Sequence, residues 1–509
     1  MVQAPGLRAG LDPGGRSRPR NGWVLLGAQE HLQGPGARRN KVEELQSKCI
    51  ISRLQLIRAG KVLNSQALGL YRCVAVSGRY ALPPGITNLD QAKPILQHAV
   101  AQVIAEQPFM QVGIADEDKQ TTSFVRVPQI SLSNHIQWFG PSHPGPDSDT
   151  DSSAGGPAPD AALCKHLSHQ HNQLWPETTQ HPPWKVSIIP LQNFEDHPTH
   201  LEVIYTFHHA ISDGTSGAIF HKRLLHALTT TPNLQNNILN LTNPPTLPLP
   251  QEHLVNSHIS WPYFLRELWT AFAPTWLKPT PESPPWTGKP ITLPPSTVTG
   301  LLSASRAQNQ TLTPLLHALI KASLARHIPP PTAPSFEPSS AISMRRFVHE
   351  KTLDINNKMS VLVTSTNHPI STTLTTALRE SCSSSSSSSS GPNLESAIWA
   401  VASSIKKDLQ TRLASLPHDD ITAVLRYVGD FHDFFRKKDG NARGNSWEVT
   451  YLGAINGNSS SSSEGENDKG EADWKLTRAV FSQSAGTVAQ AFCVNVAGIA
   501  GGETTITVT

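Results

Sequence analysis

Residues 201–228 read LEVIYTFHHAISDGTSGAIFHKRLLHAL, and they concentrate more potential chemistry than any other stretch of this chain. The first seven residues are mostly apolar, aromatic or β-branched, which predicts a buried strand. From Gly214 onward the spacing of apolar residues predicts an amphipathic helix. His208, His209 and Asp213 lie where the strand stops and the helix begins. Because loops that leave a rigid element commonly present catalytic groups, this strand–loop–helix unit is the candidate functional site.

The residue types of the HHAISDG loop favour acid–base chemistry. A histidine has an ordinary pKa of about 6.5, so it can take a proton from a hydroxyl and return it to a leaving group. Asp213 is better suited to cap the helix or to pair with a distant arginine, and Gly214 allows a positive φ angle or a close backbone approach. The loop has no obvious nucleophile, which favours direct acyl transfer over a covalent intermediate. A structural histidine beside a simple helix cap is the alternative, but the whole pattern between strand and helix favours function.

Length and composition narrow the class of protein. The 509 residues suffice for two domains or for one two-lobed unit. The formal net charge of +3 is nearly balanced and no block of basic residues occurs, so nucleic acid is not an expected partner. Scattered cysteines without CxxC spacing indicate a reducing compartment, with free thiols and no zinc site. They are Cys49, Cys73, Cys164, Cys382 and Cys493.

We expect a soluble, cytoplasmic protein. The N-terminal residues lack the apolar core of a signal peptide, and residues 1 to about 40 are rich in Gly, Pro and Arg, which predicts disorder. The chain has no run of about 18 apolar residues, so a transmembrane helix is not predicted. WPYFLRELWTAFAPTWL (261–277) contains Arg266 and Glu267 and is predicted to form an amphipathic or core-covering helix.

Strands and helices alternate in both halves of the chain, a pattern typical of α/β lobes. Turn-rich or serine-rich segments at 141–163, 383–390 and 459–463 are predicted to be exposed insertions. One predicted helix starts with Thr313 as its candidate N-cap and Pro314 in its first turn. Predicted strands span 68–80, 109–114, 182–191, 339–348, 447–455, 476–484 and 490–501; predicted helices span 41–58, 91–108, 311–328 and 404–413.

These patterns predict four parts of the chain. Residues 1–62 are expected to be a disordered or atypical N-terminal segment, and residues 63–240 an N-terminal lobe that carries the HHAISDG loop. Residues 241–300 are crowded with proline, which suits a crossover between lobes. Residues 301–509 are expected to form the C-terminal lobe, with serine-rich insertions at 381–391 and 457–472.

Other reactive side chains make weaker candidates. HLSHQH (166–171) offers three histidines, His166, His169 and His171, but no acidic or cysteine partner is near, so we expect no metal site. No histidine lies in a supporting sequence context beside Cys73, Cys164 or Cys493, so these are expected to be core or loop thiols. Ser216 starts a predicted helix whose amides could bind an anion, although a capping role is favoured.

The HHxxxDG pattern after an apolar strand resembles the coenzyme-A-dependent acyltransferase superfamily. That superfamily includes chloramphenicol acetyltransferase, the plant HxxxD acyltransferases, the condensation domains of nonribosomal peptide synthetases and the fungal alcohol acetyltransferases. Further segments, in order over residues 66–505, resemble the last group. They are LGLYRCVAVSGRY (68–80), AEQPFMQVGI (105–114), PPWKVSIIPL (182–191), WTGKP (286–290), TLTPLLHALIKASLARHI (311–328) and WEVTYLGAI (447–455).

The resemblance implies an α/β fold, a two-lobed acyltransferase-like sandwich with the active-site channel between the lobes. His209 matches the general base, and Asp213 matches the aspartate that orients the loop through an arginine, here Arg345 or Arg346. Gly214 matches the motif glycine, and His208 is a supporting residue. The resemblance implies an O-acyltransferase of secondary metabolism that esterifies a small alcohol with acetyl-CoA or another acyl-CoA as co-substrate. We expect a monomer with no bound cofactor or metal.

Some features depart from the family pattern. The DFGWG of the plant enzymes is absent, and VGDFHDFF (428–435) does not replace it. The family's segment ahead of the first strand is not recognisable in residues 1–62, and a further strand or helix would be expected after TTITVT. Two alternatives stay open: a condensation-type enzyme that takes the acyl group from a carrier protein or uses a longer acyl donor, and a non-catalytic relative that only binds a ligand.

Overall fold

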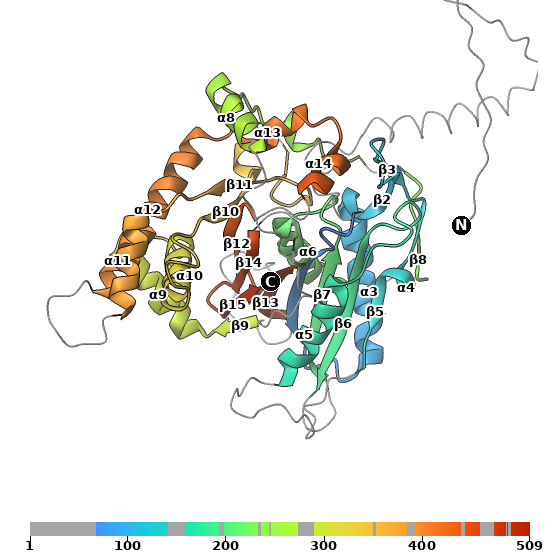
Figure 1. Cartoon of the computed structure of the whole chain (residues 1–509). Coiled ribbons are helices and arrows are strands. Elements are labelled where there is room, and N and C mark those ends of the chain that lie inside the picture. Colours follow the sequence, from blue (N-terminus) through green and yellow to red (C-terminus); the bar gives the residue numbers. More distant parts are fainter. Residues whose placement is uncertain are drawn as a thin grey trace, which may run out of the picture. The chain divides into compact units, whose positions relative to one another are not determined.

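The computed structural model describes residues 68–140, 158–192, 198–232, 236–243, 246–272, 290–349, 353–383, 393–438, 443–458, 473–484, 486 and 490–509 (Figure 1). These residues belong to one compact unit, Lys48–Thr509. The other unit, Met1–Ser47, lies outside the described residues. So do the predicted helix at 41–58, the predicted disorder before it, and the serine runs after residue 383 and from 459 to 463.

The first sheet is built around the strand that leads to the two histidines. Its order is β13 (Lys475–Gln483), β1 (Val74–Ala81), β7 (Pro198–Phe207), β6 (Trp184–Gln192) and β5 (Ile136–Trp138). β7 pairs antiparallel with both β1 and β6 and is therefore central. β13 comes from the half of the chain predicted to form the C-terminal lobe, yet it pairs with β1. The predicted lobe boundary near residue 300 therefore does not assign each strand to a sheet, because the first sheet contains strands from both sides of it.

Helices cover both faces of this sheet. On one face lie α3 (Leu89–Glu106) and α6 (Gly214–Ala227), where Tyr205 of β7 stacks on Phe220 of α6 with ring centroids 4.1 Å apart. On the other face lies α5 (Ala158–His171), whose Leu163 and Leu167 pack near Ile204. Leu201, Val203, Tyr205 and Phe207 of β7 pack in the core with α3 and α6, whereas on the other face Ile204 packs near α5 and the buried Glu202 accepts from Ser77 and Arg79.

The second sheet has the order β11 (Val363–Asn367), β10 (Pro338–Ser343), β12 (Asn445–Ile455), β14 (Gln490–Ile499), β15 (Thr504–Val508) and β9 (Pro290–Leu293). β12 pairs parallel with both β10 and β14, whereas the outer pairs are antiparallel. The neighbouring helices are α9 (Pro295–Ala307), α10 (Leu312–His327), α11 (Thr372–Ser383) and α12 (Leu394–Ser415). Trp447 and Val449 of β12 pack against Leu316 of α10 and Val401 of α12, which forms a second core.

Short elements complete the described chain. They are η2 (Pro108–Gln111), β2 (Val112–Ala115), β3 (Ser123–Arg126), β4 (Gln129–Ser131), α4 (Leu132–His135), β8 (Ile238–Asn240), α7 (Gln251–Leu254), α8 (Trp261–Phe272), η4 (Arg345–Phe347), α13 (Ile421–Val424), η5 (Leu425–Tyr427) and α14 (Phe431–Lys438).

Several predicted elements were wrong in detail. Residues 109–111 form a 3-10 turn instead of the start of a strand, since Pro108 opens a turn there. Residues 158–163 belong to α5 instead of an exposed insertion, because Leu163 is buried against the first sheet. The N-cap position of α10 is Thr311, two residues before the predicted Thr313. Within TTITVT, Thr504–Val508 form strand β15, which lies between β14 and the edge strand β9 and which the sequence pattern did not single out.

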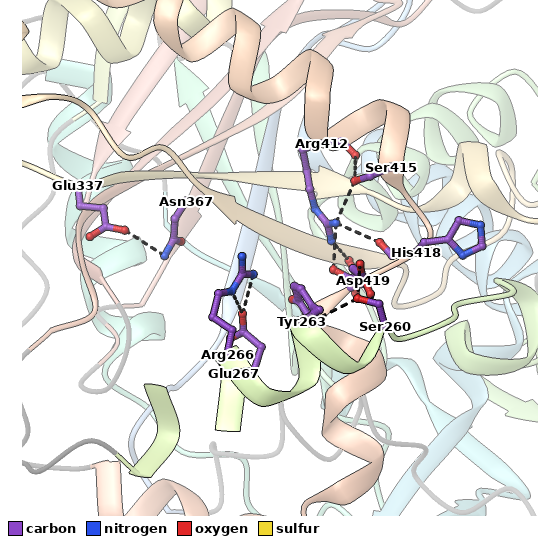
Figure 2. Close-up of polar contacts among 11 residues, drawn as sticks. Ser260, Tyr263, Arg266, Glu267, Glu337, Asn367, Arg412, Ser415, His418 and Asp419 are labelled. Carbon is purple, nitrogen blue, oxygen red and sulfur yellow. Dashed lines mark hydrogen bonds and ion pairs between the residues drawn. The ribbon is translucent and has the colours of Figure 1, made fainter. Parts of the chain in front are cut away.

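The predicted helix at 261–277 is α8, Trp261–Phe272, and it is tied to the loop that follows α12 (Figure 2). Ser260, just ahead of α8, donates its backbone N–H and its hydroxyl to the carboxylate of Asp419, at 2.6 and 3.0 Å. Arg412 of α12 donates to the backbone carbonyls of His418 and Asp419. Among the described residues, no helix is long and apolar enough to cross a membrane.

Candidate active site

The loop between β7 and α6 is held almost entirely inside the protein. The His208 backbone N–H donates to the Pro183 carbonyl at 2.9 Å, and the Ile211 N–H donates to the His208 carbonyl at 3.1 Å. From 208 to 213 every residue is buried except His209, which is partly exposed. The strand therefore ends in a tight turn that exposes one imidazole.

His209 has the hydrogen-bonding pattern of a neutral base. Its Nδ1 lies 2.9 Å from the Ser212 carbonyl oxygen, which can only accept, so Nδ1 carries the proton and Nε2 is the basic nitrogen. Burial lowers its pKa below the ordinary value, and the backbone hydrogen bonds and the charge of Asp213 offset part of that effect. The Tyr71 ring lies beside it, with centroids 5.8 Å apart. The imidazole is thus oriented, neutral and reachable.

Asp213 holds the loop in place through hydrogen bonds to the start of α6 and to Leu362. Its Oδ1 accepts from the Ser216 backbone N–H and hydroxyl, each at 2.8 Å, which makes it the N-cap of α6. Its Oδ2 accepts from the Leu362 N–H at 3.0 Å. Asp213 is only 3% exposed, and burial alone would raise the pKa of its carboxyl. The charge and hydrogen bonds of Arg345 nevertheless lower this pKa below its ordinary value. The carboxylate stays ionised in a buried site.

Arg345 is the arginine that pairs with Asp213. Its two terminal nitrogens donate to the two carboxylate oxygens at 2.7 and 3.1 Å, a bidentate geometry, and the residue is buried. Arg346 is exposed and lies over the Phe347 ring instead. Both follow β10, in η4, and are not on the strand as predicted, because the chain turns at Met344. The turn directs one arginine inward and leaves the other outside.

His208 supports the loop through a residue that the sequence did not reveal. The Ala210 backbone N–H donates to its Nδ1 at 3.0 Å, so Nε2 carries the proton and donates to Glu117 Oε1 at 2.8 Å. His208 is completely buried. Glu117 belongs to the acidic run between β2 and β3, 91 positions upstream, and no periodicity or spacing connects it with the histidines.

Gly214 serves close packing. A Cβ at this position would lie 2.7 Å from a methyl carbon of Leu452 and 3.1 Å from the Phe481 ring, so only glycine fits without displacement. Of the two roles that the sequence allowed, the structure shows the close approach, since Gly214 begins α6 without a positive φ angle. The start of the helix is thereby packed against both sheets, because Leu452 is in β12 and Phe481 in β13.

The three histidines of HLSHQH have separate environments on α5. His171 is buried between Ser482 Oγ at 2.8 Å and Cys73 Sγ at 3.1 Å, and burial lowers its pKa to about 3. His166 is buried against the Phe139 ring, and His169 is exposed. Within the described ranges, no group of three or more His, Cys, Asp or Glu side chains could hold a metal ion.

The candidate nucleophilic thiols are poorly suited to react. Burial raises the pKa of Cys73 far above its ordinary value and that of Cys493 to about 12. A nucleophilic cysteine needs its thiolate form, which burial disfavours in both cases.

Comparison with known proteins shows the family and the fold. The chain matches the alcohol acetyltransferase family over residues 163–509, more than half of its length. A protein described as "Probable alcohol acetyltransferase FCK4", from Fusarium pseudograminearum, is 27% identical over 461 residues, which cover 86% of each chain. Its name and the family match agree with the resemblance that the sequence motifs predicted.

Two solved structures share the fold. The TRI3 trichothecene 15-O-acetyltransferase of Fusarium sporotrichioides aligns with a TM-score of 0.58 at 14% identity over 88% of each chain. The first condensation domain of the CDA synthetase aligns with a TM-score of 0.55 at 12% identity over 89% of each chain. The predicted two-lobed α/β acyltransferase fold is therefore confirmed. This chain belongs to the alcohol acetyltransferase family and is an acyltransferase.

Proposed function

We propose that this enzyme transfers the acetyl group of acetyl-CoA to the hydroxyl of an alcohol, with His209 as the general base. The observation that carries the proposal is the hydrogen bond from His209 Nδ1–H to the Ser212 carbonyl, because it leaves Nε2 of this partly exposed imidazole as the basic nitrogen. The lowered pKa keeps this imidazole neutral near pH 7, which is the form a base requires. Family membership supports alcohol acetylation as the reaction class.

The proposed reaction needs no acyl-enzyme. His209 Nε2 takes the hydroxyl proton while the alcohol oxygen attacks the thioester carbonyl carbon. The tetrahedral adduct collapses with cleavage of the C–S bond, and the imidazolium gives its proton to the departing sulfur. The products are the acetate ester and free CoA, and His209 is neutral again. The absence of an activated nucleophile in the loop supports this direct route.

The other loop residues are proposed to position the base. Asp213 and Arg345 fix the loop by joining the start of α6 to the segments around η4 and Leu362. His208, anchored on Glu117, holds the turn that carries His209. Gly214 permits the close packing at the start of the helix.

A histidine substitution tests the proposal. Purified protein is incubated with labelled acetyl-CoA and a panel of primary and secondary alcohols, and ester is measured by mass spectrometry. The His209→Ala and His209→Gln variants should form ester about 10²- to 10⁴-fold more slowly, the usual contribution of a general base. Circular dichroism and the urea midpoint establish that each variant is folded.

A folded His209→Ala variant that keeps the wild-type rate would overturn the proposal. Intact-protein mass spectrometry after incubation with acetyl-CoA alone should show no added acetyl group, and a stoichiometric adduct would contradict the direct route. Ester formation with free acetyl-CoA and no carrier protein would also exclude a carrier-dependent condensation enzyme.

A further inference from the structure

One face of β12 looks toward the histidine loop, and its side chains form a polar wall. Trp447 and Val449 point into the second core, so residues 448, 450 and 452 occupy the opposite face of the strand. Leu452 contacts the start of α6, because its methyl carbon lies 2.7 Å from where a Gly214 Cβ would be. The face that carries Glu448 and Thr450 is therefore the one turned toward the proposed active site.

Hydrogen bonds connect Tyr71, whose ring lies beside His209, with Asn495 next to this face. Thr450 lies beside Asn495 in the parallel pairing of β12 with β14. Asn495 Oδ1 accepts from Gln483 Nε2 at 2.7 Å, and Gln483 Oε1 accepts from the Tyr71 hydroxyl at 3.0 Å. The Tyr71 ring is the one beside His209. The two hydrogen bonds from Tyr71 through Gln483 to Asn495 thus reach from the ring beside His209 to the β12–β14 face.

Glu448 stands on this face without a matching cation. Its Oε1 accepts from the Thr450 hydroxyl at 3.3 Å, a long bond, and no ion pair with it is found within the described ranges. The residue is half-buried, and burial raises the pKa of its carboxyl to about 7. A partly buried carboxyl without a strong partner lowers stability, so packing alone gives no reason for it.

The electrostatics of Tyr71 agree with this placement of Glu448. Burial raises the pKa of its hydroxyl well above the ordinary value, and the nearby Cys493, Cys73 and Glu448 raise it further. Along β12, Glu448 is four residues from Leu452, or about 13 Å at the usual rise per residue. The carboxyl therefore lies on the β12–β14 face that the Tyr71–Gln483–Asn495 hydrogen bonds reach, on the strand whose Leu452 contacts the start of α6.

We propose that Glu448 determines acceptor specificity by binding a second hydroxyl group of the acceptor, distant from the hydroxyl that is acetylated. The inference rests on the proposed function and adds the substrate class: alcohols that carry a second hydroxyl. A hydroxyl suits this position because it donates to an ionised carboxylate and can also pair with a protonated carboxyl. Thr450 orients the carboxyl, and Tyr71 separates it from the base.

A series of matched acceptors tests the inference. Steady-state constants are measured with acetyl-CoA for straight-chain α,ω-diols from four to twelve carbons and for the 1-alkanols of equal length. The wild type should favour the diol by at least about 10-fold in kcat/KM at one or more chain lengths, because a buried acceptor group left unpaired is costly. Glu448→Leu should remove that preference by raising KM for the diol, with kcat/KM for the 1-alkanol changed less than about 2-fold.

Two further variants keep the test decisive. Glu448→Gln, which retains hydrogen-bonding capacity, should keep part of the preference and serves if the leucine variant does not fold. Glu395→Gln is the matched control, because Glu395 is an exposed glutamate in the first turn of α12, a helix that packs on the opposite face of the second sheet, and it accepts from Trp399 at 3.3 Å. It should leave all constants unchanged.

The possible failures are distinguishable. A wild type that acetylates 1-alkanols without favouring any diol overturns the role of Glu448 and leaves the proposed function standing. The same holds if Glu448→Leu lowers kcat equally for both acceptors. No ester from any alcohol or diol overturns the proposed function itself.

Discussion

The buried pair of Asp213 and Arg345 allows a quantitative test of how the loop is held. We consider Arg345→Met, Asp213→Asn and the double variant. Arg345→Met leaves a buried carboxylate with only backbone and hydroxyl donors, from Ser216 and Leu362. Asp213→Asn keeps a side chain able to cap α6 but leaves the guanidinium without its bidentate partner.

The expected cost follows from the burial of the pair. Breaking a buried ion pair by removing one partner costs about 3–5 kcal/mol, because an uncompensated charge stays inside the protein. Stabilities of folded domains are about 5–15 kcal/mol, so each single variant should fold with a clearly reduced margin. The double variant removes both charges, so its loss should be smaller than the sum of the single losses by about 2 kcal/mol or more.

Urea unfolding followed by tryptophan fluorescence measures these losses, and the acetylation assay measures kcat at saturating substrates. We expect kcat to fall in all three variants, since the loop that carries His209 loses its brace. Losses of stability under about 1 kcal/mol in the single variants that simply add in the double variant would contradict a coupled, buried ion pair. So would an unchanged kcat in a folded Arg345→Met protein.

Two further outcomes are expected. A Cβ at Gly217 would overlap a methyl carbon of Val76, so Gly217→Ala should push α6 away from β1 and lower the free energy of unfolding by about 1–3 kcal/mol. Adding Val76→Ala to the same chain should restore part of the loss. Equal urea midpoints for wild type and Gly217→Ala would contradict this expectation. Burial lowers the pKa of His221 to about 4, although its hydrogen bond to the Val76 carbonyl acts in the opposite direction. The folded protein therefore keeps His221 neutral, whereas the unfolded chain binds a proton there once the pH falls below about 6.5. Its contribution, up to about 3 kcal/mol, should be lost between about pH 6.5 and 4, and His221→Gln should flatten the fall in urea midpoint between pH 7.5 and 5; an unchanged slope would count against the assignment.

Local patterns predicted the elements around the site well. The apolar run before His208 and the spacing after Asp213 gave β7 and α6 with boundaries close to those observed. These predictions succeed because the spacing of apolar residues along a short segment shows which of its positions are buried. Predictions failed where a turn or a distant contact decided the outcome. Residues 158–163 looked like part of a polar insertion, but Leu163 finds the far face of the first sheet, a partner that no local pattern indicates.

The sequence alone predicted the acyltransferase class, which the family match shows. HHxxxDG brings the proposed base His209, the helix-capping Asp213 and Gly214 together within seven residues, so the motif can be recognised without knowledge of the fold. It could also limit the partner of Asp213 to Arg345 or Arg346, but not choose between them.

The contacts around the His208–Asp213 loop could be seen only in the folded protein. Arg345, 132 positions from Asp213, is selected by the turn after β10, and Glu117 meets His208 across 91 positions. Glu448 lies on the face of β12 opposite the second core, the face whose Leu452 meets the start of α6. The physical reason is common to all three. Which face of a strand is exposed, and which loops meet, depends on the packing of segments far apart in the chain, whereas a motif records only what a few consecutive residues can do.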